Sequence, residues 1–170
     1  MRRVLAAIGS VLVAAALAAG SGANFQSSSA NAGNLIKAGV LSITSTKSGS
    51  AVLNVSALAP GHSVFDTVTI TNTGDLASVI TLSGANYVDT PASPALSNKV
   101  DLKIEDTTAS TTLYNGKLGA FVSANAGTFA VNASHTFKFT VTLADGGTGA
   151  EDAYQGARST VDYTWTGAPA

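Results

Sequence analysis

Cysteine is absent from the 170-residue chain, and histidine occurs only twice. Without cysteine the chain has no disulfide, no thiol nucleophile and no thiolate ligand for a metal. Charged residues make up only 11% of the chain, and it has a single tryptophan. The sequence also lacks the motifs of zinc proteases, serine hydrolases and phosphate-binding loops. These absences leave little for catalysis and favour a structural or binding protein.

The first 23 residues have the layout of a secretory signal peptide. A positive start (residues 1–3) precedes an apolar run (residues 4–19) and then small residues that end in Ala23. The apolar run of about sixteen residues is shorter than the roughly 20 that span a bilayer comfortably. We therefore expect cleavage after Ala18 or Ala23 and export to the extracellular matrix or cell surface, with no membrane contact afterwards.

Removal of the leader makes the chain more acidic. Arg2 and Arg3 are two of the nine basic residues, so seven remain against ten acidic residues, and the net charge is near −3. The remaining cations are scattered singly along the chain. Nucleic acids and anionic lipids require clustered cations, so neither is expected as a partner.

Alternation of apolar and polar residues predicts one all-β domain over residues 39–167. The residues from Thr112 to Gly116 end in Asn-Gly, a strong turn signal, and residues 118–122 fit either a strand or one helical turn. The spacing indicates a single antiparallel β-sandwich, either a jelly roll or an immunoglobulin-like fold. Strands are expected at residues 39–43, 51–55, 63–71, 78–83, 99–105, 136–143 and 161–165.

Two of these strands repeat one pattern at an offset of 73 residues. The copies are APGHSVFDTVTITNTG at 59–74 and NASHTFKFTVTLADGG at 132–147. In the first copy Asp66 has the parity of the apolar residues Val64 and Val68, where the second copy has Phe139. The pattern leaves open a bulge, a change of parity or a hydrogen-bonded buried carboxylate at this position.

The two histidines are the only candidate imidazole ligands. His62 and His135 precede the same repeated strand, so they would share a zinc site if the fold brings the two strand starts to one end. Zinc needs a third ligand, and no carboxylate is placed to supply it, so polar residues at strand junctions are the simpler interpretation. Loop acids at 105–106 and 145–152 match no calcium-binding spacing and indicate solvated charge. No cofactor is predicted, with zinc and calcium as the alternatives.

Residues 24–38 form a polar segment rich in serine, asparagine and alanine. This composition predicts a segment that is flexible in the isolated monomer. An extended segment can add as a strand to the sheet of another molecule, and head-to-tail addition that does not close makes filaments. Its apolar residues Phe25, Leu35 and Ile36 are the candidate assembly anchors.

Motifs in order along nearly the whole chain resemble the TasA/camelysin family of secreted bacterial matrix and spore-coat-associated proteins. One departure is Gln26-Ser27, where the family usually has Ser-Asp after the phenylalanine. The resemblance implies a jelly roll, a dedicated signal peptidase and, for some members, biofilm fibres. Other members are described as metallopeptidases, but no zinc motif is found here. The motifs are Phe25, NLIKAGVL (34–41), LAPG to TNTG (58–74), LYNG (113–116), AYQG (153–156) and VDYTW (161–165).

We therefore expect a secreted structural protein that polymerises with itself by N-terminal strand donation. Other matrix or surface proteins are possible further partners. The alternative is a secreted camelysin-like metallopeptidase that uses His62 and His135 with a loop carboxylate. A third reading is a surface domain that binds a glycan or another protein without polymerising.

Overall fold

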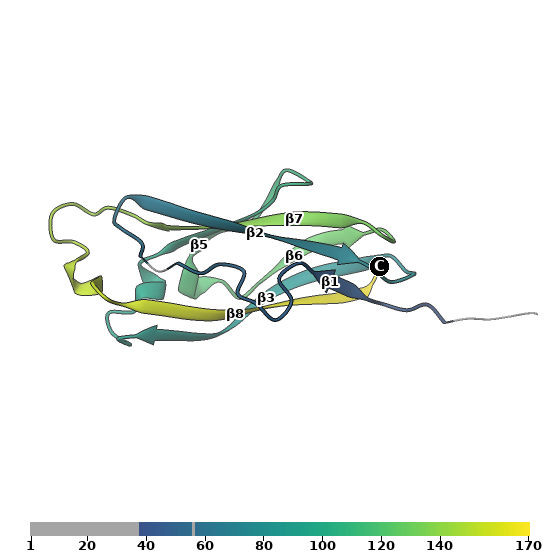
Figure 1. Ribbon diagram of the computed structural model, residues 1–170, viewed down its shortest axis with the longest axis horizontal. Helices are drawn as coiled ribbons and strands as arrows, with labels where there is room; N and C mark the ends of the chain where they lie inside the picture. The colour runs from purple at the N-terminus through teal and green to yellow at the C-terminus, as the bar shows by residue number, and fades with distance from the viewer. Residues whose placement is uncertain (1–37, 56) are drawn as a thin grey trace, which may run out of the picture. The chain divides into compact units, whose positions relative to one another are not determined.

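Alternating apolar and threonine-rich segments form strands, and these build two antiparallel sheets (Figure 1). The computed structural model describes residues 38–55 and 57–170. The predicted leader and the predicted anchors Phe25, Leu35 and Ile36 lie outside the described residues. The strands are β1 (Ile43–Ser45), β2 (His62–Asn72), β3 (Ser78–Thr90), β4 (Asp101–Asp106), β5 (Thr111–Lys117), β6 (Ser123–Phe129), β7 (Ser134–Leu143) and β8 (Arg158–Pro169).

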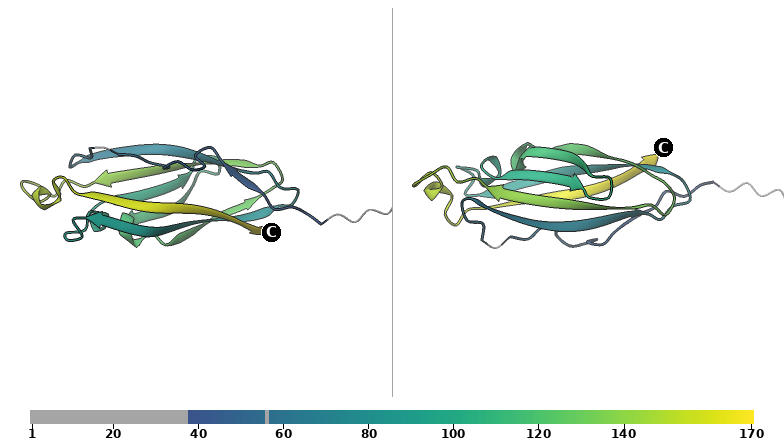
Figure 2. Two further views of the ribbon diagram at one scale, coloured as in Figure 1. Left: turned by 60° about the horizontal axis from the view of Figure 1, so that its bottom comes forward. Right: turned by 90° about the horizontal axis from the view of Figure 1, so that it is seen from above.

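The predicted all-β class is confirmed, and the two sheets pack against each other as in a β-sandwich (Figure 2). The larger sheet has the strand order β1-β2-β7-β4-β5, and the smaller sheet has the order β6-β3-β8. Three short 3-10 helices lie between strands: η1 (Leu96–Asn98), η2 (Leu118–Ala120) and η3 (Asp152–Tyr154). In the described part of the chain, no helix has the length and apolar character needed to cross a membrane.

The two copies of the repeated pattern are neighbours in the larger sheet. β2 and β7 pair antiparallel, with His62 opposite Leu143 and Asp66 opposite Phe139. Their inward residues are buried and their outward residues are mostly Thr and Ser, so the predicted faces of both strands are confirmed. Hydroxyl groups bridge the two strands on the outer face at Ser63–Thr142 (2.6 Å), Thr69–Thr136 (2.9 Å) and Thr71–Ser134 (2.7 Å).

The core lies between the two sheets and contains four buried phenylalanines. Phe137 and Phe139 come from β7 in the larger sheet, and Phe129 from β6 in the smaller one. Each is 0% exposed. Aliphatic residues complete the core: Val68, Ile70, Ile80, Leu82, Val100, Leu102, Ile104, Leu118, Val141 and Leu143.

The first two predicted strands are wrong in extent. At residues 39–43, only Ile43 belongs to a strand, because pairing with β2 is limited to β1. At residues 51–55 no strand forms. After a turn at residues 46–49 the chain leaves the edge of β2, so these residues have no ladder partner and contribute only apolar side chains.

The predicted turn at Asn115-Gly116 is also wrong, because both residues lie within β5 and pair with β4. The chain reverses earlier, at residues 107–110, where the Asp106 carboxylate accepts hydrogen bonds from the N–H groups of Thr108 and Ala109 (2.9 and 3.0 Å). Gly116 is needed for space, since a Cβ there would lie 2.8 Å from the Tyr114 hydroxyl. Tertiary packing therefore overrides the local turn preference.

Strand β6 was not predicted, since its sequence SANAGTF has too few apolar residues to show alternation. Of the two alternatives for residues 118–122, the helical turn is confirmed as η2. The predicted loop at 144–156 is present and contains η3. Weakly patterned segments are thus placed by their neighbours and not by their own periodicity.

Asp89 fastens η1 to the end of β3. Its carboxylate accepts hydrogen bonds from the N–H and the hydroxyl of Ser97 (2.9 and 2.7 Å). Burial opposes the charged form, but these hydrogen bonds outweigh it and hold the pKa of Asp89 below its usual value. The contact positions Leu96, the first residue of η1, toward the core.

We expect Asp89→Asn to lower the free energy of unfolding by about 1–2 kcal/mol at pH 7, the usual cost of weakening hydrogen bonds to a charged group. Because the folded pKa is depressed, the native contribution is present above the unfolded pKa of about 3.9 and is lost as pH falls below it. Urea unfolding at pH 7 and pH 3 should show the difference between wild type and variant shrinking in acid. A difference that is equal at both pH values would contradict this assignment.

Candidate functional site

The smaller sheet leaves one side of the core incompletely covered. On β3, the inward-facing Ile80 and Leu82 are 0% exposed. On the adjacent β8, the inward row of Val161, Tyr163 and Trp165 is only half-buried, although it packs against the core. Among the strands that the structure describes, none lies on the far side of β8 to cover this row.

The edge of β8 is free along this opening. Among the described residues, β8 pairs only with β3, from Ser78–Pro169 at one end to Thr90–Arg158 at the other. An unpaired edge presents a row of backbone N–H and C=O groups that can pair with another chain. This edge is long, since β8 spans 12 residues.

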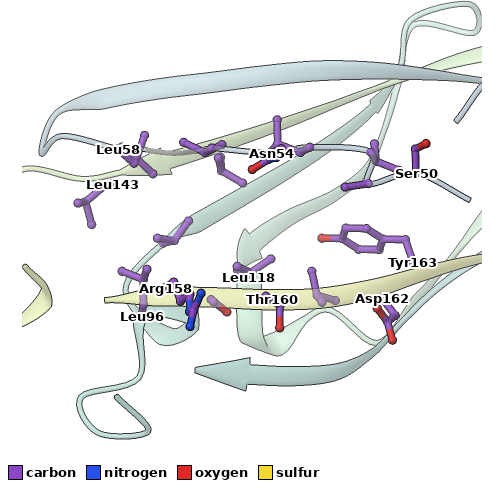
Figure 3. A pocket seen from close by; sticks show the side chains of 18 of the residues that line it. Ser50, Asn54, Leu58, Leu96, Leu118, Leu143, Arg158, Thr160, Asp162 and Tyr163 are labelled. Carbon is purple, nitrogen blue, oxygen red and sulfur yellow. The ribbon is translucent and has the colours of Figure 1, made fainter. Parts of the chain in front are cut away.

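A groove of about 1650 Å³ runs beside β8. Its floor contains Leu96, Leu118 and Leu143, and Tyr163 projects into it from β8 (Figure 3). Typical small-molecule pockets measure about 300–1,000 Å³, so this groove is larger than such a site. Its lining combines an apolar floor with polar walls, which suits an extended polypeptide.

The opposite wall of the groove is formed by residues 47–55, which we call the covering segment. In Figure 3 this segment, with Ser50 and Asn54, faces β8 across the groove. Its side chains Val52, Leu53 and Val55 are partly buried against the core. The covering segment thus supplies apolar contact where the strand predicted at residues 51–55 would have supplied a ladder.

A contact with the covering segment accounts for the carboxylate at an apolar position of β2. Asp66 keeps the inward parity of β2, and its carboxylate forms an ion pair with Lys47 while its side chain stays 44% exposed. It is therefore neither a parity change nor a fully buried carboxylate. The Lys47 ammonium, which donates to the carboxylate, holds the pKa of Asp66 below its usual range, and the N–H of Thr67 (2.7 Å) adds to this effect.

The floor of the groove carries no charge at physiological pH. Burial raises the pKa of Tyr163 well above its usual value, with smaller contributions from Tyr87 and Tyr114. Glu151 lies in the lining but is bonded to Lys99 (2.7 Å) and to the N–H of Gly146 (3.0 Å). The leucine floor can therefore bind apolar side chains without first neutralising a charge, while Asp152, Arg158 and Asp162 add charged side chains elsewhere in the lining.

These features together describe a site for an extended chain: an apolar floor, a free strand edge and charged side chains around them. No family model and no curated protein matches this chain. What the groove binds must therefore be inferred from its own geometry.

The structure does not bring the two histidines together. His62 pairs with Leu143 and His135 with Ile70, so they stand at opposite ends of the β2–β7 ladder. A separation of eight positions along a strand corresponds to about 27 Å. The shared zinc site of the metallopeptidase alternative is therefore not formed by these residues. Within residues 38–55 and 57–170, no three His, Cys, Asp or Glu side chains gather into a possible metal site.

His135 instead contacts a carboxylate that sequence analysis placed in solvent. Asp106 is 1% exposed, and its Oδ2 lies 2.5 Å from Nδ1 of His135. The imidazole stacks on Phe129, with ring centroids 4.1 Å apart. The sequence contains a signal for the burial of Asp106, because this residue continues the inward parity of Leu102 and Ile104. The pair closes the end of the sandwich beside the 107–110 turn and lies outside the groove lining.

The acidic loop at 145–152 is likewise only partly solvated. Asp145 and Asp152 are exposed, as expected, but Glu151 is only 8% exposed. Its hydrogen bond raises the pKa of Lys99, and its charge adds to that effect. The expectation of solvated charge is therefore wrong for Glu151, whose partner lies on another segment and could not be identified from spacing alone.

Proposed function

We propose that the mature chain is a secreted structural protein of the extracellular matrix or cell surface that assembles into fibres. Residues 24–37 of one copy would add as a strand in the groove of the next copy. The observation that carries this proposal is the free edge of β8 beside an open apolar groove. Strand addition uses such an edge, with backbone hydrogen bonds for affinity and side-chain pockets for specificity.

The length of the N-terminal segment matches the acceptor. Fourteen extended residues span at most about 46–50 Å, and the 12 residues of β8 span about 40 Å at strand rise. The segment could therefore cover the whole edge of β8. In an extended strand Phe25 and Leu35 lie on the same face, so these two anchors would face the leucine floor, and Ile36 would point to the opposite side.

The point of attachment favours a neighbouring copy as the acceptor. Residues 38–42 lie at the end of the domain where β8 finishes (Figures 1 and 2). There Asp75 N–H donates to the carbonyl of Val40 (3.0 Å), and Thr73 and Gly74 donate to Ser42 (2.9 and 3.0 Å). The segment is thus joined to one end of the domain, and donation to the next copy along gives an open, head-to-tail array. The ordered motifs shared with the TasA/camelysin family support the same proposal.

Protein that begins at Asn24 is expected to form filaments in negative-stain electron microscopy, and protein that lacks residues 24–36 is expected to stay monomeric. The deletion removes the donor strand and none of the described core. A synthetic peptide of residues 24–37 should bind the shortened protein and change the emission of Trp165, the only tryptophan. Trp165 lines the groove, so its fluorescence reports occupancy directly.

Two point variants sharpen this test. Leu35→Asp places a charge on the face that the anchors Phe25 and Leu35 share and should abolish filaments, whereas Ser28→Asp adds the same charge to the polar part of the segment and should preserve them. Filaments formed by the 24–36 deletion would overturn strand donation. Monodisperse particles from both the intact and the shortened protein would overturn polymerisation itself.

A further inference from the structure

The covering segment is bound by side chains and hardly at all by its backbone. Among the described residues, no backbone N–H of residues 51–55 donates a hydrogen bond, and only the carbonyl of Val52 accepts one. Val52, Leu53 and Val55 nevertheless pack against the core. A segment with exposed, unpaired backbone belongs to the part of a structure that opens at low free-energy cost.

Lys47 is the polar attachment of this segment. Its Nζ donates to the carbonyl of Val52 (2.9 Å) and to the Asp66 carboxylate on β2. One side chain therefore closes the loop of the covering segment upon itself and fastens that loop to the larger sheet. Lys47 is 25% exposed, so solvent only partly screens this contact.

A donor strand would form the backbone hydrogen bonds that the covering segment does not form. A strand placed along β8 can pair its backbone with the free edge and its apolar side chains with the floor of the groove. The covering segment offers apolar side chains only, so the exchange adds a backbone ladder without giving up one. Val52, Leu53 and Val55 already cover part of the core beside the groove, so a guest strand that covers the core completely would displace them.

We propose that the covering segment is a displaceable cover of the groove and that Lys47 is the latch that holds it closed until a donor strand arrives. This inference rests on the proposed assembly, since it names how the acceptor site is regulated. The occupant that displaces the cover is the 24–37 segment of a second copy. The latch slows assembly by holding the covering segment against the core in the monomer.

Assembly kinetics test the latch. Lys47→Met keeps the aliphatic stem and removes the ammonium, and Asp66→Asn removes the charge of its partner. Light scattering of protein beginning at Asn24 should show an assembly half-time about two- to fivefold shorter for each variant, the range expected for a partly exposed ion pair. Lys103→Met is the matched control, because Lys103 pairs with Glu105 (2.6 Å) on the outward face of β4, and its half-time should equal that of wild type.

Hydrogen exchange separates the failure of the latch from the failure of assembly. In freshly prepared monomer, Lys47→Met should speed exchange of amides in 47–55 and 158–165 about two- to fivefold, and Lys103→Met should not. Unchanged exchange together with unchanged or longer half-times would overturn the latch while assembly stands. If no variant assembles, including wild type, the proposed function fails, and faster exchange in Lys47→Met alone would still establish the cover.

Discussion

Replacing Phe137 with alanine is expected to lower the free energy of unfolding by about 3–5 kcal/mol, the usual cost of removing a buried phenylalanine. Phe137 is 0% exposed, and its ring centroid lies 4.6 Å from that of Trp165 on the opposite sheet. The ring therefore bridges the two layers at the side where the core is least covered. Since a domain is stable by only about 5–15 kcal/mol, the variant should lose a large part of its stability in urea unfolding.

Phe65→Ala is the matched control on the neighbouring strand. Phe65 is 60% exposed on the outer face, and its main contact is the Lys138 ammonium, 4.3 Å from the ring centroid. An exposed cation–π contact is worth about 0.5–1 kcal/mol, so the loss should stay near or below that value. Equal losses at Phe65 and Phe137 would show that the two faces of the larger sheet are wrongly assigned.

Asn72→Asp is expected to destabilise the fold by about 3–5 kcal/mol at pH 7, as an uncompensated buried charge does. The Asn72 side chain is buried, and its amide donates to the carbonyls of Leu76 (2.8 Å), Phe129 (3.1 Å) and Ala130 (3.2 Å). A carboxylate at this position would face three acceptors and donate to none. Equilibrium unfolding in urea measures the loss.

The penalty of Asn72→Asp should depend on pH. Burial next to carbonyl groups raises the pKa of the new carboxyl in the folded state, so the protein is least destabilised in acid and loses stability as pH rises through that raised value. Asn125→Asp is the control, because Oδ1 of Asn125 only accepts a hydrogen bond, from Gly127 N–H (2.7 Å), which a carboxylate also accepts. A penalty at Asn72 no larger than that at Asn125 would contradict the buried amide network.

Strict alternation was the part of the fold that could be predicted from sequence. β2, β4 and β7 each carry apolar residues on one parity and polar residues on the other, so their existence and their buried faces follow from period 2 alone. The 51–55 segment has similar apolar residues but forms no ladder with any described strand, and apolar content without a ladder partner does not make a strand. Asn115-Gly116 failed for the opposite reason, since pairing with β4 overruled its turn preference.

The groove could not be predicted from the sequence of β8, because it depends on which strands pair with β8. Among the described strands only β3 does. Val161, Tyr163 and Trp165 alternate as clearly as the residues of β2, yet they remain half-buried since no strand covers them. The order of the strands in a sheet determines which apolar rows are covered, and periodicity does not encode that order. The contact between His135 and Asp106 would have been easier to predict from sequence, because each residue has the parity of the buried residues on its own strand.

The pairing of the two repeated strands gives the centre of the larger sheet an approximate rotational symmetry. Residues 66 and 139 are equivalent in the repeat and are also direct cross-strand partners, so a local twofold axis passes between them. A half-turn about this axis exchanges the Val68–Phe137 pair with the Val141–Val64 pair. At the axis itself the equivalence fails, because one partner is a carboxylate that holds Lys47 and the other is a buried phenyl ring. The backbone ladder is thus nearly symmetric, but its two halves carry different side chains, and the difference in charge and burial is largest at the pair next to the axis.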